Sequence, residues 1–251
     1  MGQGRGGKPD ERGDRVIVAI HNHKGGVGKS TTAIHLGAAL ANSGQTVAVI
    51  DADAQADSTK GLGVEPRAGT ARWFQTGDWT AEPARERLDL LPTIALRDDE
   101  PVWWEQIPPA TVAERFSAIR GQYGWIIVDT PPTVSTWIRA LLGAADRVLV
   151  PVDLEFYSFD GVQNFVRGLP PGKLVGLLPV RFDRRTSVSP RYMELLKRIG
   201  GAYVIPAIRE CVDLRKAAEA GSTIWEFAPA STAAEDYLAT LEWMVDNFGR
   251  I

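Results

Sequence analysis

A glycine-rich loop between an apolar run and a helical pattern constrains this chain more than any other feature. The loop spans residues 23–30, reads HKGGVGKS, follows an apolar run at 15–22 and precedes a helical pattern at 29–42. Its three glycines let the backbone curl so that successive N–H groups converge on one anion, and the helix N-terminus adds its positive end. A strand, such a loop and a helix in succession predict an α/β fold that binds phosphate.

Two side chains in the loop match the chemistry of a nucleoside triphosphate. Lys29 is placed to reach the β and γ phosphates, and the Ser30 hydroxyl is placed to coordinate Mg²⁺. The plain Walker pattern has glycine where this chain has His23, and a second lysine, Lys24, begins the loop instead. A dinucleotide-binding turn is the rival interpretation, but its third glycine falls on Thr31 and it does not require Lys29 and Ser30.

The rest of the chain alternates short apolar runs with helical patterns, which is typical of a doubly wound, mostly parallel sheet. We predict a flexible tail at residues 1–14 and a single α/β domain at 15–251, with about seven or eight strands flanked by helices. The candidate strands are Arg15 to Asn22, Thr46 to Asp51, Leu88 to Leu91, Trp125 to Asp129, Arg147 to Val152, Leu174 to Phe182 and Tyr203 to Ile205. The candidate helices are Lys29 to Asn42, Thr111 to Ile119, Phe159 to Val166, Ser189 to Ile199, Leu214 to Ala220 and Thr232 to Asn247.

Residues 61–109 form the least regular part of the chain. They hold four of the eight tryptophans, namely Trp73, Trp79, Trp103 and Trp104. Such a cluster indicates either an insertion that packs onto the sheet or a surface for a partner. We favour the packed insertion.

Acidic residues follow two of the predicted strands. Asp129 ends the apolar run 125–129 in the manner of a Walker B acid, which sits beside a phosphate loop and orients Mg²⁺. Asp51 and Asp53 follow the second run, and the C-terminal ends of parallel strands gather at the ligand crevice. One of these two acids is expected to position the attacking water.

Composition excludes several classes of site and location. Cys211 is the only cysteine, so a single chain holds no intrachain disulfide, thiolate zinc cluster or ferredoxin-type cluster. No stretch reaches the roughly 18 apolar residues of a membrane span, and the first residues lack the apolar core of a secretion signal, so we expect a cytoplasmic protein. The net charge of −3, taken alone, disfavours nucleic acid as a partner.

From residue 15 onward the chain resembles the ParA-type partition ATPases, which form the deviant Walker A group together with MinD and the nitrogenase iron protein. The lysine-first loop is the most specific part of the resemblance. The other matching segments agree in order and spacing, and they are Asp51-x-Asp53-x-Gln55, Asp129-Thr130-Pro131-Pro132, residues 145–155, residues 183–186 and Ile205-Pro206.

The resemblance implies a role for each matched residue. Lys24 matches the signature lysine that crosses to the partner's phosphates in an ATP-sandwich homodimer, and Asp53 matches the acid that orients water. Ser30 and Asp129 are implied as Mg²⁺ ligands, with Asp51 assisting through water. The implied ATP-binding residues are Lys24, Gly25, Gly26, Val27, Gly28, Lys29, Ser30, Thr31 and Pro206, and the implied catalytic residues are Lys24, Lys29 and Asp53.

A basic segment, residues 173–216, indicates what the protein acts on. It carries ten Lys and Arg against four Asp and Glu, a net of +6, whereas the rest of the chain has a net of −9. ParA-type proteins bind DNA without sequence preference through this segment, by contacts to phosphates. The residues expected to contact DNA are Arg184, Arg185, Arg209, Arg215 and Lys216.

Two other branches of the group fit less well. MinD has a basic amphipathic C-terminal helix that lies on membrane, whereas the corresponding segment here, from Glu235 to Arg250, has four acidic residues and one arginine, a net charge of −3. The iron protein needs cluster cysteines from each subunit, and Cys211 alone does not supply them.

The resemblance therefore implies a cytoplasmic, nucleoid-associated switch that dimerises with ATP, binds nonspecific DNA and hydrolyses ATP slowly. Together with a ParB-like activator it would segregate or position plasmid or chromosome DNA. The alternatives are ParA-like positioning of a non-DNA cargo and a MinD-like membrane organiser. A nucleotide-gated adaptor without hydrolysis is a further alternative, because the family usually has proline where this chain has Ala54.

Overall fold

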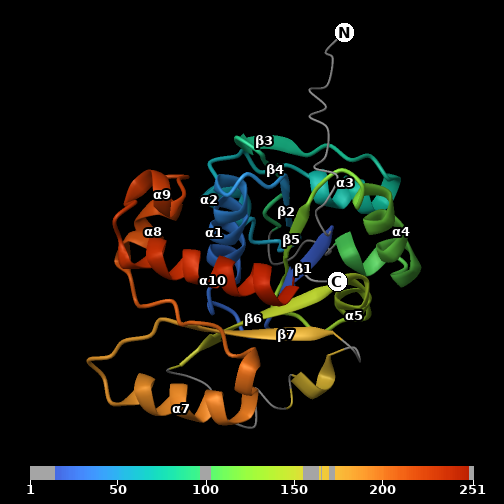
Figure 1. Ribbon diagram of the computed structural model, residues 1–251. Coiled ribbons are helices and arrows are strands. Elements are labelled where there is room, and N and C mark those ends of the chain that lie inside the picture. Colours follow the sequence, from blue (N-terminus) through green and yellow to red (C-terminus); the bar gives the residue numbers. More distant parts are fainter. Residues whose placement is uncertain (1–14, 97–102, 155–163, 165, 170–172, 249–251) are drawn as a thin grey trace.

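The computed structural model describes residues 15–96, 103–154, 164, 166–169 and 173–248. Among them a seven-stranded sheet has the order β3-β4-β2-β5-β1-β6-β7, and the pairing of β3 with β4 is antiparallel while the others are parallel (Figure 1). The strands are β1 (Val16–Ile20), β2 (Val47–Asp51), β3 (Glu82–Arg85), β4 (Leu88–Leu91), β5 (Trp125–Asp129), β6 (Arg147–Asp153) and β7 (Leu174–Val180). The predicted doubly wound, mostly parallel sheet is confirmed.

The composition of each strand explains its place in the sheet. β1, β2 and β5 are buried at every position, as expected for parallel strands that helices cover on both faces. β3 is partly exposed and contains Pro83, which has no amide donor and therefore suits an edge strand. Because β3 lacks an apolar run, the sequence patterns did not reveal it.

Helices lie on both faces of the sheet (Figure 1). One layer holds α1 (Lys29–Asn42), α2 (Asp57–Gly61), α8 (Val212–Glu219), α9 (Ile224–Phe227) and α10 (Thr232–Phe248). The other holds α3 (Gly69–Thr76), α4 (Pro109–Ile119) and α5 (Thr136–Ala144), while α7 (Val188–Gly200) lies beyond β7. Each face has its own large apolar core, one around α1 and α10 and one around α3, α4 and α5.

Several predicted elements differ from the structure. Tyr203 to Ile205 form no strand: Val204 makes an isolated bridge to Leu177, and Tyr203 belongs to the short 3-10 helix η2 (Gly201–Tyr203). Pro206, which follows Ile205, has no backbone N–H to donate, so a regular ladder does not continue along β7. The helix predicted over 159–166 and the tail at 1–14 lie largely or wholly outside the described residues. The short helices α2, α3, α5 and α9 were not predicted.

The tryptophan-rich segment packs onto the sheet as predicted. Trp73 is fully buried, and Trp103 and Trp104, in the 3-10 helix η1 (Trp103–Gln106), are 6% and 5% exposed. Trp103 meets Trp137 of α5 edge-on, with ring centroids 5.3 Å apart, and stacks against Phe74. The segment therefore forms the apolar core on the α3–α5 face rather than an exposed aromatic surface.

The register of the central strands places the chemical groups. Ile20 pairs with Asp129, and Asp51 pairs with Asp129, so the last residues of β1, β2 and β5 lie side by side. The glycine-rich loop leaves β1 at this level and enters α1. The sheet thus brings the loop and the strand-end carboxylates together.

Candidate nucleotide-binding site

The glycine-rich loop has the backbone form expected of a phosphate cradle. Gly26 and Gly28 have φ angles of 72° and 79°, in the left-handed region that favours glycine. A side chain added at either position would meet no atom within 4 Å, so the glycines serve the backbone rather than close packing. Asn22 fixes the start of the loop, because its amide donates to the Pro151 carbonyl at 2.8 Å and its oxygen accepts the Lys24 N–H at 3.0 Å.

Lys29 is a buried cation at the first turn of α1. Its side chain lies at the mouth of the loop, and Nζ donates to the Lys24 carbonyl at 3.2 Å. Burial lowers the pKa of Lys29, and the nearby Asp129 and Asp53 carboxylates oppose that shift. Gly28 provides no side-chain cap for α1, which leaves the first N–H groups of the helix for a ligand.

Asp129 is a buried acid with one unused oxygen. Its Oδ2 accepts a hydrogen bond from the Ser58 hydroxyl at 2.7 Å, whereas Oδ1 is buried and has no hydrogen-bond partner among the described residues. Burial raises the pKa of Asp129 to about 7, against hydrogen bonds from Ser30 and Ser58. A buried carboxylate oxygen without a partner is costly unless a cation or a proton satisfies it.

These residues fit a bound Mg²⁺. Oxygen donors are the ligands that Mg²⁺ takes in proteins, and Ser30 and Asp129 supply a hydroxyl and a carboxylate beside the loop. Asp51 is occupied differently: its carboxylate accepts from the Asp53 N–H, the Thr59 N–H and the Thr59 hydroxyl at 3.2, 2.8 and 2.7 Å. Burial and the neighbouring Asp129 raise its pKa well above the usual value. The predicted assistance of Asp51 through water remains a prediction.

Asp53 lies close to both Lys29 and the loop. It is 8% exposed, it accepts the Gln55 N–H at 3.1 Å, and burial raises its pKa while the Lys29 charge lowers it. The segment after it turns through Ala56, whose φ is 56°, and the Ala54 carbonyl accepts the Leu96 N–H at 3.0 Å. The backbone around Ala54 is thus held without the proline that the family usually has there.

Other predicted residues lie around this group. Thr31 is in the first turn of α1. Pro206 is exposed on the extended segment beside β7, where the Ile205 N–H donates to Leu177 and the Ile208 N–H to Pro179. The roles predicted for Lys24, Thr31 and Pro206 concern a bound nucleotide or a second subunit and stay predictions.

Sequence reasoning missed three groups that organise the site. In α2, the Ser58 hydroxyl donates to Asp129 and the Thr59 hydroxyl donates to Asp51. The two consecutive hydroxyl residues after the Asp-x-Asp motif were the sequence signal that could have found them. Arg181 reaches from the end of β7 to the loop, where it donates to the Gly26 carbonyl at 2.8 Å. It was counted only as one charge of the basic segment.

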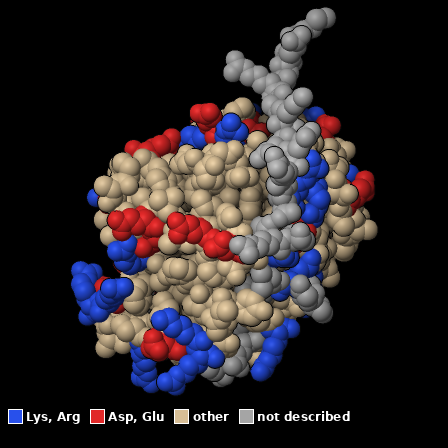
Figure 2. Space-filling model, viewed as in Figure 1, with Lys and Arg blue, Asp and Glu red and all other residues tan. Residues whose placement is uncertain are grey.

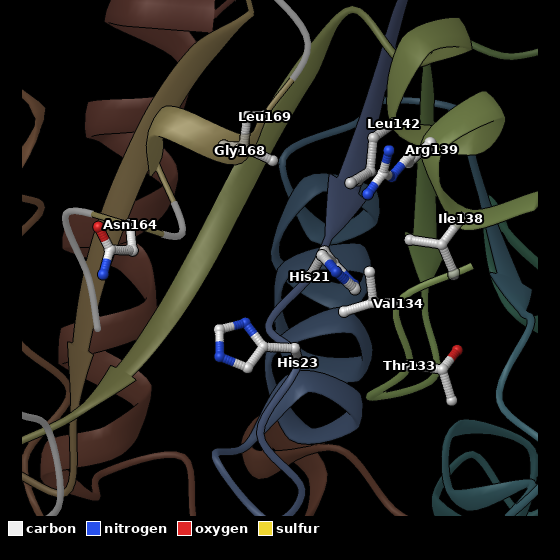
Figure 3. Close-up of a pocket in the computed structure, with 10 residues that line it drawn as sticks. All are labelled: His21, His23, Thr133, Val134, Ile138, Arg139, Leu142, Asn164, Gly168 and Leu169. Atoms are coloured by element: carbon white, nitrogen blue, oxygen red, sulfur yellow. The ribbon is translucent and has the colours of Figure 1, made fainter. Parts of the chain in front are cut away.

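A separate pocket of about 420 Å³ opens next to the start of the loop. Figure 3 shows its lining: His21 and His23 follow β1, one wall comes from the α5 region and the other from Asn164, Gly168 and Leu169. His21 is buried, its Nδ1 lies 2.7 Å from the Thr130 hydroxyl, and burial lowers its pKa to about 3. Lys29 and Asp129 do not line this pocket, so it is distinct from the phosphate cradle.

The basic segment is largely exposed, but some of its charge is already paired. Basic side chains gather over α7 and the loop before it, and acidic side chains follow α10 (Figure 2). Arg185 is 87% exposed and is paired with Asp183 at 2.8 Å, and Lys216 lies 3.6 Å from Asp213. Arg184 and Arg215 are exposed and make no ion pair with the residues that the structure describes.

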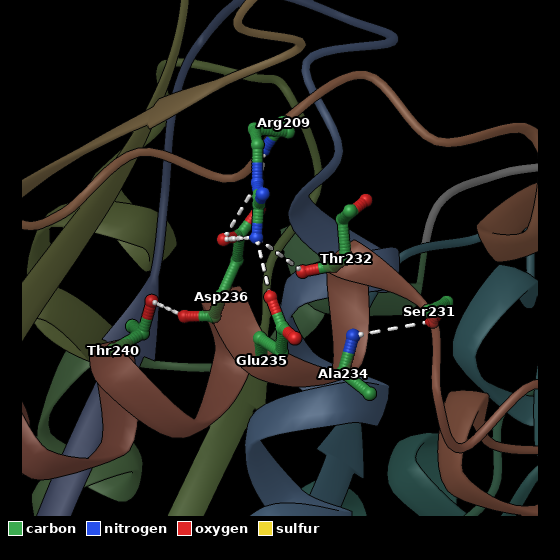
Figure 4. A network of polar contacts seen from close by, with 7 residues as sticks. All are labelled: Arg209, Ser231, Thr232, Ala234, Glu235, Asp236 and Thr240. Carbon is green, nitrogen blue, oxygen red and sulfur yellow. Dashed lines mark hydrogen bonds and ion pairs between the residues drawn. The ribbon is translucent and has the colours of Figure 1, made fainter.

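Arg209 is the most strongly held of these arginines. Its Nε and Nη2 both bond to Asp236 of α10, at 2.7 to 3.0 Å, and Nη2 also reaches Glu235 at 2.9 Å (Figure 4). The Arg209 N–H donates to Asp236 as well, at 2.8 Å. Arg209 therefore fastens the segment beside β7 to α10, and a contact with DNA would have to use its remaining Nη1 donors.

Known proteins resemble the chain over most of its length. A family model described as an AAA domain matches residues 15–170. The chromosome-partitioning ATPase Soj of Thermus thermophilus is 33% identical over 236 residues, covering 88% of this chain and 91% of Soj. A plasmid partition protein of Borrelia burgdorferi, bound to AMPPNP, has a TM-score of 0.77 at 24% identity and covers 95% of this chain and 99% of its own. MinD of Pyrococcus horikoshii, complexed with Mg-ADP, has a TM-score of 0.76 at 19% identity, with 93% and 96% covered.

Among the helices that the structure describes, none is both long enough and apolar enough to cross a bilayer.

Proposed function

The chain belongs to the ParA family of partition ATPases, and from that premise we propose a DNA-positioning switch that dimerises with ATP. In the ATP state it binds DNA without sequence preference, and slow hydrolysis, stimulated by a ParB-like activator, releases it. The observation that carries the proposal is the group formed by Lys29, Asp53 and Asp129 at the mouth of the glycine-rich loop. Its buried charges and its unused Asp129 oxygen call for a polyphosphate and a cation.

The residues at the strand ends support slow hydrolysis. Phosphoryl transfer depends on positioning and on charge stabilisation rather than on covalent chemistry. The loop amides and Lys29 would bind the β and γ phosphates, and Asp53 would orient the attacking water. Lys24 would add positive charge to the phosphates of a second subunit. Mg²⁺, held by Ser30 and Asp129, would neutralise charge on the β and γ oxygens.

The basic segment supports DNA as the partner. Arg184, Arg185, Arg215 and Lys216 are exposed, and contacts of such side chains with phosphates carry no sequence information. We include Arg209 in the contact surface through its Nη1 donors. Contacts of this kind would hold the protein on the nucleoid within the cytoplasm.

The test measures binding to a DNA duplex of random sequence with ATP and Mg²⁺, with ADP and Mg²⁺, and without nucleotide, over a series of salt concentrations. We expect binding that needs ATP and weakens steeply as salt rises. Equal binding in all three nucleotide states, or no binding at low salt, would refute the switch. Size-exclusion chromatography with light scattering in the same three states reports whether ATP produces dimers.

The alternative functions give different results in two further assays. A MinD-like organiser would float with anionic liposomes in ATP, and α10 makes this unfavourable because Glu235, Glu242 and Asp246 are exposed on it. A nucleotide-gated adaptor would bind ATP and release no phosphate even with DNA and activator present. ParA-like positioning of a non-DNA cargo would leave ATP-dependent dimers that do not bind DNA.

A further inference from the structure

Arg181 lies where three parts of the molecule meet. It is the first residue after β7, and its guanidinium makes two hydrogen bonds in different directions. Nη1 donates to Oδ2 of Asp153, the last residue of β6, at 3.0 Å, and Nη2 donates to the Gly26 carbonyl of the glycine-rich loop at 2.8 Å. A single side chain thus ties the loop to the ends of two strands.

The setting of Arg181 differs from that of an ordinary surface ion pair. The Asp153 side chain is 3% exposed, so its carboxylate depends on partners within the protein. Arg181 itself has a φ of 55°, a left-handed conformation that is unfavourable for a residue with a side chain. Strain of this kind is retained where the surroundings hold the residue in place, and here the surroundings are Asp153 and the loop.

The bond to Gly26 has a direct consequence for the loop. Every peptide described is trans, so the carbonyl of Gly26 and the N–H of Val27 lie in one plane and point in opposite directions. When Arg181 holds the carbonyl on the side of β6 and β7, the Val27 N–H faces the other way. A cradle of converging N–H groups requires such outward carbonyls.

We propose that Arg181 is a positioning residue for the phosphate cradle: it orients the Gly26–Val27 peptide so that the Val27 N–H faces the β and γ phosphates of the bound nucleotide. Asp153 holds the guanidinium in place for this task. The proposal rests on the nucleotide-binding function and adds a residue outside the loop to it. Lysine would not replace Arg181 fully, because only the planar guanidinium presents two donors in a fixed fork.

The test compares Arg181→Met, Arg181→Lys, Arg181→Gly and Asp153→Asn with the wild type. Arg181→Gly removes the guanidinium and suits the left-handed backbone, so it folds even if Arg181→Met does not. The control is Arg72→Met, which removes an arginine of α3, away from the loop, together with its ion pair with Asp78. Each variant is assayed for the Kd of ATP, for KM and kcat of hydrolysis, and for the thermal midpoint without nucleotide.

We expect Arg181→Met and Arg181→Gly to raise the Kd and KM for ATP about tenfold, because the bound nucleotide loses one hydrogen bond to a charged phosphate. The kcat at saturating ATP stays within about twofold, because uniform binding is lost rather than stabilisation of the transition state. The Kd for ATP of Arg181→Lys lies between those of the wild type and Arg181→Met. The double variant with Asp153→Asn and Arg181→Met has the same Kd as Arg181→Met alone.

Two results would overturn the proposal. One is a Kd for ATP within twofold of the wild type in both Arg181→Met and Arg181→Gly. The other is a weakening that Arg72→Met reproduces, which would mean a general loss of stability. A wild-type protein that binds no ATP would instead remove the proposed function, so the two failures are distinguishable.

Discussion

The two charged regions of this protein hold their charges in opposite ways. At the strand ends, Lys29, Asp51, Asp53 and Asp129 are each less than a tenth exposed. In the basic segment, the Arg185 side chain is 87% exposed and that of Arg209 is 36% exposed. The first region holds desolvated charges close together, and the second spreads solvated charges over a surface.

The difference teaches which effects to expect from each region. Buried charges interact strongly in a low local dielectric, so removing one of them has a large effect on the step that depends on it. Exposed charges act through a screened field and contribute in roughly equal, graded amounts. The following predictions test that contrast, from the largest expected effect to the smallest.

Lys29→Ala should abolish nucleotide binding. We expect the Kd for ATP to rise at least about hundredfold, because a desolvated cation that faces the phosphates is lost. Equilibrium titration with a fluorescent ATP analogue measures it, with Lys197→Ala, an exposed lysine on α7, as the control. Retained affinity in Lys29→Ala would show that the buried lysine does not face the phosphates.

Asp53→Ala should separate binding from turnover. We expect kcat to fall about hundredfold, the usual contribution of a positioned acid or base, with the Kd for ATP little changed. Phosphate release and light scattering with ATP are the measurements, and ATP-dependent dimers should persist. Monomers in ATP, or unchanged turnover, would refute the role of Asp53.

His35, a buried residue of α1, should make the fold sensitive to acid. Burial lowers its pKa to about 3, so the native state keeps it neutral while the unfolded chain protonates it below its ordinary value of 6.5. Its contribution to stability is complete above pH 6.5 and falls towards pH 3, by about 1.4 kcal/mol per pH unit. Urea unfolding measures the free energy of unfolding at pH 7 and pH 5. The difference between these two values should be smaller for His35→Gln than for the wild type. An identical difference would contradict the prediction.

Joint replacement of Arg184 and Arg185 by Glu should weaken DNA binding in ATP about tenfold or more and flatten its salt dependence, since two phosphate contacts are lost. ATP affinity and the thermal midpoint should not change, because both side chains are exposed. Fluorescence anisotropy over a salt series measures the slope. Replacing Glu86 and Glu114 by Lys reverses two exposed charges elsewhere and is the control. Unchanged DNA affinity would remove these residues from the contact surface.

Arg209→Gln should affect stability more than the other arginines of the segment. It breaks the paired hydrogen bonds to Asp236, and we expect a loss of about 1 kcal/mol after allowing for solvent screening. Its effect on DNA affinity should be smaller than that of the Arg184 and Arg185 pair. A large loss of DNA affinity at unchanged stability would place Arg209 among the main DNA contacts.

Strong local patterns made much of the molecule predictable. α1 has the predicted bounds because the glycine-rich loop marks its start and its apolar residues follow a helical period. β5 ends at the predicted Asp129 because a buried strand is a clear apolar run. β3 and α5 were missed. β3 has no apolar run, and α5 has only nine residues in which to show a helical pattern. Short elements depend on packing more than on local preference.

The sequence by itself determined the fold class and the phosphate loop, since both depend on backbone freedom and on the period of apolar residues. Only the tertiary structure decided which charges are buried, because burial depends on what packs against each residue. It made Asp51 a partner of Thr59, left Oδ1 of Asp129 without a partner, and fastened Arg209 to Asp236. It also brought Arg181, 155 residues along the chain, to the carbonyl of Gly26.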